Sequence, residues 1–253
     1  MSLLHYVVEQ TNKGKTMSEN RIICLKKRKS YDKQCDNISE YKILDVTSRN
    51  PNEKVAKDLS PLWLHGCMSS DGEACYRFEN LWQYTKVYKE FTDEYGNPNE
   101  EYWKWRSDAF ASTDKGVRFP FGRARRPEYA YWMIDGKWYK LGYLDARKII
   151  YIPEYAKLVV KTEFYKQLKE YYDSNPEVKI ALLDYDNYNN HHKEYNMSLV
   201  DVYNCHKKAG HAFVLKMLLQ GDIEVVDGEV IDHIGVLKVD LPEPEEYRQL
   251  KLF

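Results

Sequence analysis

The chain of 253 residues carries 38 Lys and Arg against 39 Asp and Glu, so its net charge of −1 excludes a general attraction to nucleic acid or anionic membranes. Its length allows it to bury a core without disulfides or a structural metal, and no apolar run approaches the ~20 residues of a membrane span. Five cysteines without tight spacing, and an N-terminus without the basic start of a signal peptide, favour a cytoplasmic protein in a reducing compartment.

The N-terminal forty residues have little pattern. An apolar triplet is followed by the basic run Lys26–Lys29, which is predicted to be a solvated loop after an edge strand, although it could also contact phosphates. The segment YKILDV, from Tyr41, reads as a short strand that ends before Asn50 and Pro51.

Two helices are predicted in the middle of the first half. The first spans Phe78 to Phe91, because its apolar residues recur with helical spacing on one face. The second begins at Asn97 and Pro98, an N-cap followed by a residue suited to the first helical position, and runs to about Phe110.

The second half alternates loops, strands and helices. Asp135-Gly136 and Asp227-Gly228 predict the turns of two β-hairpins. The other predicted elements are a basic loop at 115–126, helices at 144–151, 154–172 and 198–220, a buried strand at 178–185 and a polar loop at 186–196. We therefore predict one α+β domain over 41–220, mainly helical around a small sheet, with an N-terminal extension (1–40) and a C-terminal β-hairpin and tail (221–253).

A metal site is the first candidate for chemistry, and the spacing disfavours it. Cys67, Cys75, Cys205, His206 and His211 would have to converge without the ligand spacing usual for zinc. The two histidines lie five residues apart on a predicted helix, which places them on different faces. We therefore predict no metal ligand.

A polar stripe on the first helix is the second candidate. Glu79, Gln83 and Lys86 stand at i, i+4 and i+7, so one ligand could contact all three. A carboxylate beside an ammonium can orient water, accept a proton or hold a ribose edge. The alternative is an ordinary solvent-exposed face with a salt bridge.

Two further segments carry candidate binding residues. The basic loop has four arginines interleaved with Phe119 and Phe121, a combination that can grip a diphosphate or a nucleic-acid strand, or can simply face water. Asp184 and Asp186 follow a buried strand, where α/β folds place ligands. The alternative is that Asp186 and Asn187 only make the turn.

These segments, in this order, resemble the NADAR superfamily of NAD- and ADP-ribose-associated, N-glycosidase-like domains, and more closely an uncharacterised branch of it. FENLWQYTKVYK resembles the family's Glu-His/Asn-x-x-Gln-x-x-Lys helix, FGR its Gly-Arg step, and GYLDARKIIYIPEYAKLV a further family helix. IALLDYD takes the place of the family's Leu-Val-Glu strand end, and GHAFVLKMLL resembles its closing helix. The segment DNYNNHHKEYN stands in place of the family's Asp-x-x-Trp-Gly loop, and Asp184 stands where the family usually has a Glu.

The resemblance implies hydrolysis of an N-glycosidic bond between ribose and a base in a nucleotide-like substrate. The partner would be an ADP-ribose derivative or an ADP-ribosylated nucleic acid, and neither a metal nor another cofactor is expected. One carboxylate would stabilise an oxocarbenium-like ribose and the other would activate water. The residues implied as catalytic are Glu79, Lys86 and Asp184, and those implied in substrate binding are Trp82, Gln83, Gly122, Arg123, Arg147, Tyr151 and Asp186.

Two alternatives to hydrolysis stay open. The first is a binding module that sequesters an ADP-ribose-type nucleotide without cleaving it, for example in phage–host conflict. Its support is a composition with 22 Tyr against 8 Phe, which is typical of an AT-rich genome. The second is nucleic-acid recognition through Lys26–Lys29 and Arg118–Arg126, which predicts affinity that falls steeply with salt.

Overall fold

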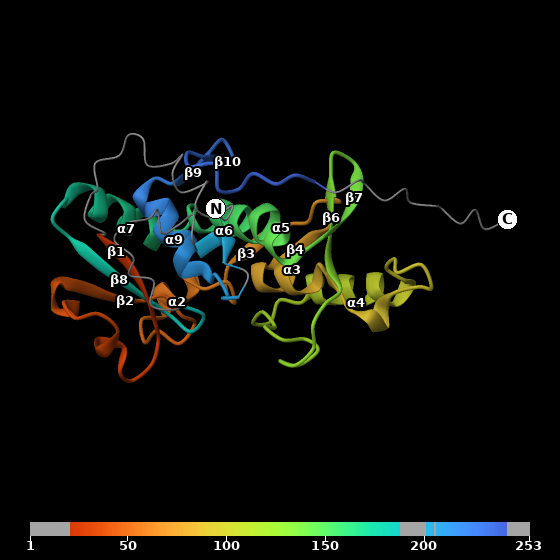
Figure 1. Ribbon diagram of the computed structural model, residues 1–253, viewed down its shortest axis with the longest axis horizontal. Coiled ribbons are helices and arrows are strands. Elements are labelled where there is room, and N and C mark those ends of the chain that lie inside the picture. Colours follow the sequence, from red (N-terminus) through yellow and green to blue (C-terminus); the bar gives the residue numbers. More distant parts are fainter. Residues whose placement is uncertain (1–20, 188–200, 205, 242–253) are drawn as a thin grey trace, which may run out of the picture. The chain divides into compact units, whose positions relative to one another are not determined.

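The computed structural model describes residues 21–187, 201–204 and 206–241 of the chain. These residues form two compact units, whereas the sequence analysis predicts a single domain. Unit 1 takes its described residues from Met1–Ser60 and Ile152–Leu237, and unit 2 takes them from Pro61–Tyr151 and Lys238–Phe253. The chain therefore leaves unit 1 after Ser60 and returns to it at Ile152. Together the units make a mixed α+β protein (Figure 1).

Unit 1 is built on a parallel sheet. Its elements are β1 (Ile22–Lys26), η1 (Tyr31–Gln34), η2 (Ile38–Glu40), β2 (Tyr41–Asp45), α2 (Glu53–Leu59), α6 (Ile152–Val159), α7 (Glu163–Ser174), β8 (Lys179–Asp184), α9 (His211–Gln220), β9 (Ile223–Val226) and β10 (Glu229–Asp232). The strand order is β1-β8-β2, and both outer strands run parallel to β8 (Figure 1). All three carboxyl ends thus meet at one edge of the sheet.

The central strand β8 is apolar and buried from Ile180 to Leu183, as predicted for 178–185. Strand β1 pairs with β8 along its whole length, so part of the predicted N-terminal extension belongs to the main sheet. The predicted long helix from Ser198 begins outside the described residues. In the described part of that region, 201–203 are helical, 206–210 are not, and α9 begins at His211.

Unit 2 combines an antiparallel sheet with helices. Its elements are β3 (His65–Met68), β4 (Ala74–Arg77), α3 (Phe78–Tyr84), β5 (Lys86–Val87), η3 (Lys89–Phe91), α4 (Glu100–Ala111), β6 (Tyr129–Ile134), β7 (Lys137–Leu141), α5 (Tyr143–Ala146) and the π-helical turn η4 (Arg147–Tyr151). Strands β5-β6-β7 form one sheet, and β3 pairs with β4. An extensive aromatic cluster, which includes Tyr88, Phe91, Tyr102 and Tyr131, forms a core of this unit.

Both predicted hairpin turns are confirmed. Asp135 and Gly136 have φ of 50° and 74° between β6 and β7, and Asp227 and Gly228 have φ of 50° and 84° between β9 and β10. Two positive φ angles in succession are the signature of a type I′ turn, for which Asp-Gly is a preferred pair.

Several helix predictions need correction. The helix predicted over 154–172 is divided into α6 and α7, because 160–162 form a turn and Thr162 caps a new helix. The helix predicted over Phe78–Phe91 ends at Tyr84, because Lys86 and Val87 pair with β6 instead. Strand pairing with a distant segment here overrides a local helical pattern. The next helix is capped by Asn99 rather than Asn97, since the Asn99 side chain accepts a hydrogen bond from Tyr102 N (3.0 Å).

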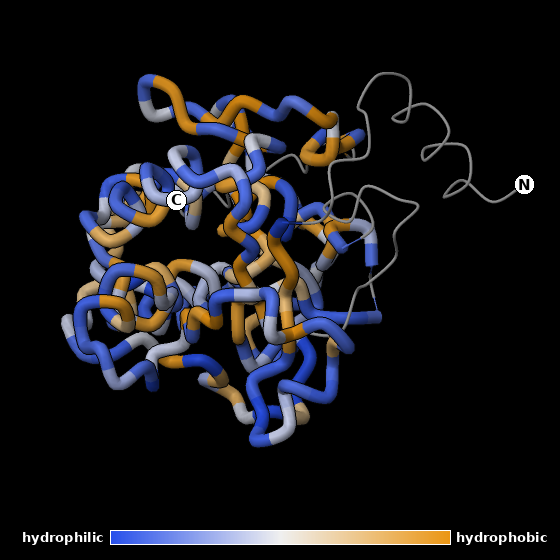
Figure 2. Tube along the Cα trace, turned by 90° about the vertical axis from the view of Figure 1, so that its left-hand side faces the viewer, coloured by the Kyte–Doolittle hydropathy of each residue, from blue (hydrophilic) through white to orange (hydrophobic). Residues whose placement is uncertain are grey.

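Polar and apolar segments alternate along the trace, as Figure 2 shows by hydropathy. Within the ranges that the structure describes, no helix is both long enough and apolar enough to cross a membrane.

Candidate functional site

The polar stripe of the sequence analysis forms a connected chain of side chains in unit 2. Gln83 Nε2 donates a hydrogen bond to Glu79 Oε1 (2.7 Å), and Lys86 Nζ donates one to Gln83 Oε1 (2.8 Å). We call Glu79, Gln83 and Lys86, together with Trp82 and Tyr151, the Glu79 cluster. Because a carboxylate can only accept and an ammonium can only donate, the Gln83 amide has a single possible orientation between them.

The cluster is not an exposed helix face. Glu79 is 6% exposed and Gln83 is 7% exposed, and every residue of the short helix α3 is buried. The solvent-face alternative is therefore wrong for these two residues. Lys86 lies after the end of α3 yet still reaches Gln83, because the chain turns directly into β5 and leaves the ammonium only three residues from the amide.

A close backbone approach holds Glu79 in place. Glu79 N donates to Pro61 O (3.0 Å), and Gly116 N donates to Leu62 O (3.0 Å). A Cβ added at Gly116 would lie 2.6 Å from Glu79 Cβ, which is too close for any side chain. Gly116 therefore permits the start of the basic loop to pack directly on the catalytic candidate.

Buried rings line the other side of the cluster. The Lys86 ammonium lies 4.2 Å from the centroid of the Trp82 ring, a cation–π contact. The edge of Tyr151 meets Trp82 with centroids 5.0 Å apart, and Tyr151 also contacts Phe78 at 5.4 Å. The Trp82 ring thus helps to fix the ammonium, in agreement with the position of Trp82 on the apolar face of the predicted helix.

The other predicted residues of unit 2 differ in their exposure. Arg147 is 1% exposed and lies 4.6 Å from the centroid of the Tyr143 ring. Gly122 is exposed with φ of +82° and ends a turn in which its N–H bonds Phe119 O (3.0 Å). Arg123 is exposed and lies over Phe119 at 5.5 Å. In the described part of the chain, no hydrogen bond or ion pair joins Arg123 to the Glu79 cluster.

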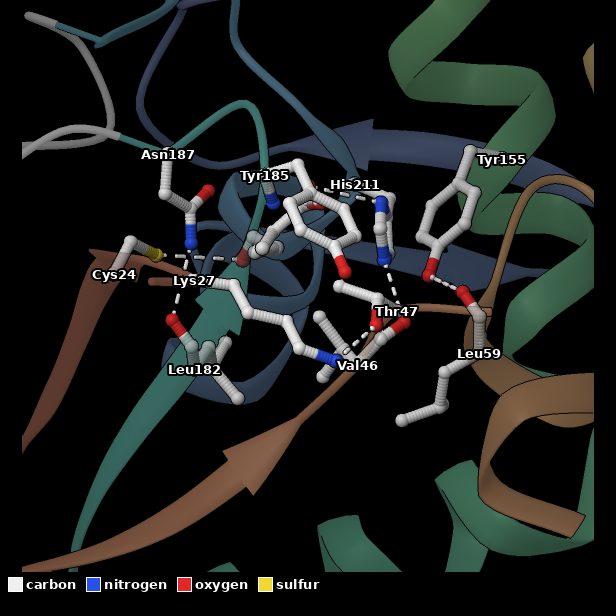
Figure 3. Close-up of polar contacts among 12 residues, drawn as sticks. Cys24, Lys27, Val46, Thr47, Leu59, Tyr155, Leu182, Tyr185, Asn187 and His211 are labelled. Carbon is white, nitrogen blue, oxygen red and sulfur yellow. Dashed lines mark hydrogen bonds and ion pairs between the residues drawn. The ribbon is translucent and has the colours of Figure 1, made fainter. Parts of the chain in front are cut away.

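Asp184 ends strand β8 of unit 1, at the carboxyl edge of the parallel sheet, and Figure 3 shows the neighbouring residues Val46, Asn187 and His211 at this edge. Asp184 is 5% exposed, and its partner is His211, whose Nδ1 lies 3.1 Å from Asp184 Oδ2. The second ring nitrogen, Nε2, lies 2.8 Å from Val46 O at the end of β2. Asp186 is half-buried just beyond β8, and Asn187 ties two strands together by donating to Leu25 O and Leu182 O (3.0 Å each).

From the sequence, Asp184 and Glu79 are implied in one catalytic site, whereas in the structure the two carboxylates belong to different units. In the sequence, His211 is considered only as a metal ligand, and Gly116 and Gly210 are not singled out. The sequence contains one local signal for the pairing of Asp184 with His211, which is the Gly-His step before an apolar helix. This signal can be interpreted only when the end of β8 is known to lie beside that helix. A strand-end carboxylate and a helix-start histidine are joined by tertiary structure alone.

The cysteine and histidine positions considered for zinc are dispersed. Cys67 and Cys75 face each other across β3 and β4, His206 is exposed, and Cys205 lies outside the described residues. Burial raises the pKa of Cys75 to about 12, which disfavours the thiolate that a metal needs. Among the described residues, no group of three or more His, Cys, Asp or Glu side chains is arranged to hold a metal ion.

Comparison of the chain with models of known protein families, with curated proteins and with solved structures finds no match.

Proposed function

We propose that the chain is an N-glycosidase that hydrolyses a ribose–base bond in a nucleotide-like substrate, with Glu79 as its central carboxylate. The observation that carries the proposal is the chain of hydrogen bonds of 2.7 and 2.8 Å that joins buried Glu79 and Gln83 to half-buried Lys86. The resemblance of the segment that contains these residues to the NADAR motif supports the same chemistry.

The reaction requires a carboxylate near the sugar. The bond from C1′ to the base nitrogen breaks with its electron pair going to the base, which leaves positive charge on the ribose. A carboxylate in a water-poor site stabilises that charge far better than one in bulk water. Water then bonds to C1′, and the proton that it loses is taken up by the departing nucleobase, which holds the electron pair of the broken bond, or by solvent. Glu79 is 6% exposed and is the carboxylate that we propose for this role.

Gln83 supplies the second element of the proposal, which is a fixed amide between the carboxylate and the ammonium. The amide accepts from the ammonium and donates to the carboxylate, so it holds both groups in one orientation. We propose that Lys86 neutralises a phosphate or the departing base, and that Gln83 acts as a positioning residue rather than by touching the substrate.

The ligand class remains as the sequence analysis has it, an ADP-ribose derivative or an ADP-ribosylated nucleic acid. The basic loop offers groups that suit such a ligand. Arg118 is half-buried and Arg123 is exposed, and their guanidinium groups lie 5.2 and 5.5 Å from the centroid of the Phe119 ring. The guanidinium groups suit phosphate and the ring suits a base. Asp184 is proposed as a second functional carboxylate only on the resemblance, and its variant is tested separately from that of Glu79.

The test is a product analysis by mass spectrometry. Purified protein is incubated with NAD, ADP-ribose, ADP-ribosylated guanosine and DNA, and ribosylaminopyrimidine phosphates. The wild type is expected to release the base from at least one member, and Glu79→Gln to lose at least 100-fold of that rate. Glu101→Gln is the matched control, because Glu101 also lies in the first turn of a helix of unit 2 but is exposed. A ligand that is bound and recovered intact, or no reaction with any member, would contradict the proposal.

A further inference from the structure

The carboxyl edge of the sheet in unit 1 contains a buried pair, Asp184 and His211, and the histidine of this pair has no role in the proposed function. His211 is the first residue of α9, and its ring lies among Tyr155, Val46 and the end of β8 (Figure 3). It is 6% exposed and Asp184 is 5% exposed. Two buried titratable groups in contact need an account of where their protons are.

The two contacts of the ring bear on its protonation state. Nδ1 lies 3.1 Å from Asp184 Oδ2, and Nε2 lies 2.8 Å from Val46 O. A backbone carbonyl can only accept, so Nε2 carries a hydrogen. When Asp184 is ionised, its carboxylate also only accepts, and Nδ1 then carries a hydrogen as well. A histidine with both nitrogens protonated is a cation.

We propose that His211 is held as an imidazolium and serves as a positioning residue that fixes Asp184, ionised and in one orientation, as a charged clamp joining the ends of β2 and β8 to the start of α9. All residues of this clamp belong to unit 1, and the clamp does not depend on the N-glycosidase proposal.

The neighbouring backbone is shaped for the same contact. Asp184 Oδ1 accepts a hydrogen bond from Tyr185 N (2.6 Å), which fixes the second oxygen of the carboxylate. A Cβ at Gly210 would overlap Asp184 Oδ2, so only glycine lets the carboxylate reach the first turn of α9. The amino end of that helix also favours a negative charge.

The groups that face His211 favour the charged ring. Burial lowers the pKa of His211, but the Asp184 carboxylate, its hydrogen bond, the Val46 carbonyl and Asp186 together raise it above 6.5. Tyr155 on α6 faces the ring at 5.8 Å and donates its hydroxyl to Leu59 O (2.6 Å); burial raises the pKa of Tyr155 well above 10, so it stays neutral. On β1, burial likewise raises the pKa of Cys24, and its thiol stays neutral.

The sign of the pH effect follows from the raised pKa. A histidine that binds its proton more tightly in the folded state stabilises that state fully below the unfolded pKa of about 6.5. This contribution is lost as the pH rises through the folded pKa. Unit 1 is therefore expected to weaken on the alkaline side, and the clamp to release Asp184 there.

The direct test is ¹⁵N NMR of histidine-labelled full-length protein, with the His211 ring assigned from its loss in His211→Gln. Both ring nitrogens are expected to be protonated at pH 7, with a transition above pH 6.5. Asp184→Asn should move that transition below 6.5, because burial then dominates. Asp45→Asn, at the end of the neighbouring strand β2, should leave it in place. An unprotonated ring nitrogen at pH 7 in the wild type would overturn the proposal.

Stability provides the second readout. Thermal unfolding of His211→Gln and wild type is compared from pH 5.5 to 9.5, with His233→Gln as the control, since His233 forms an exposed pair with Glu224 in the same unit. The clamp predicts a Tm loss of about 5 °C or more at pH 6 that shrinks towards pH 9.5. An equal loss at every pH would mean a packing role only and would also overturn the proposal. If His211→Gln does not fold, the wild-type NMR titration still decides the matter.

Discussion

Replacing Gln83 by leucine tests whether the amide bridge organises the Glu79 cluster. Leucine has nearly the same volume but can neither donate to Glu79 nor accept from Lys86. Each lost hydrogen bond involves a charged group and is worth about 1.5–3 kcal/mol when buried. Lys86 is only half-buried, so its share is smaller, and we expect a total loss of about 2–4 kcal/mol in the free energy of unfolding.

The chain provides a matched control and a selective probe. Gln167 donates to Glu163 at the same i, i+4 spacing (2.8 Å), but on the exposed surface of α7. Gln167→Leu should therefore cost only about 0.2–0.5 kcal/mol. All six tryptophans lie between Pro61 and Tyr151, so their fluorescence in urea reports on unit 2, while circular dichroism follows both variants. Equal losses for the two variants would refute the reasoning that burial makes the Gln83 bridge strong.

Two further predictions concern unit 2 and use the same urea assay. Gly116→Ala should cost about 1–3 kcal/mol by overlapping Glu79 Cβ, whereas Gly142→Ala, whose nearest atom would be 3.8 Å away, should cost clearly less; an unchanged Gly116 variant would show that the loop moves freely. Asp71→Asn should cost about 1–3 kcal/mol at pH 7, because Asp71 binds the buried Arg106 guanidinium at 2.6 and 2.8 Å. Burial raises the pKa of Asp71, but the hydrogen bonds and charge of Arg106 outweigh it and lower the pKa below 3.8. The stabilisation is thus complete above pH 3.8 and lost as the pH falls through the folded pKa; a difference between Asp71→Asn and wild type that does not shrink at all as the pH falls below 3.8 would contradict this origin.

Local chemistry determined which elements the sequence could predict. The two Asp-Gly turns need residues that tolerate positive φ, so the two residues alone are enough to predict each turn. The strand at 178–185 is legible because burial on both faces leaves a continuous apolar run. These features depend on nothing outside a few neighbouring residues.

Elements whose limits are set by distant partners could not be predicted. The first helix ends at Tyr84 because Thr85 O accepts from Tyr131 N (2.8 Å), a contact made across 46 residues of sequence that no periodicity reveals. The division into two units likewise depends on which segments pack after Ser60 and before Ile152.

The candidate site was predictable in part for the same reason. Residues Glu79, Gln83 and Lys86 were found because their spacing is local, although the interpretation as a continuous helix was wrong at its end. The partner of Asp184 was missed, because His211 reaches it only through the packing of α9 against β8.

The most direct test of the central claim is the incorporation of oxygen from H₂¹⁸O during base release from the substrate panel. Hydrolysis at C1′ predicts one ¹⁸O atom in the ribose product of the wild type and of Glu101→Gln, with the base released unlabelled, and almost no product from Glu79→Gln. Release without ¹⁸O in the ribose, or release by Glu79→Gln at the wild-type rate, would contradict an N-glycosidase centred on Glu79.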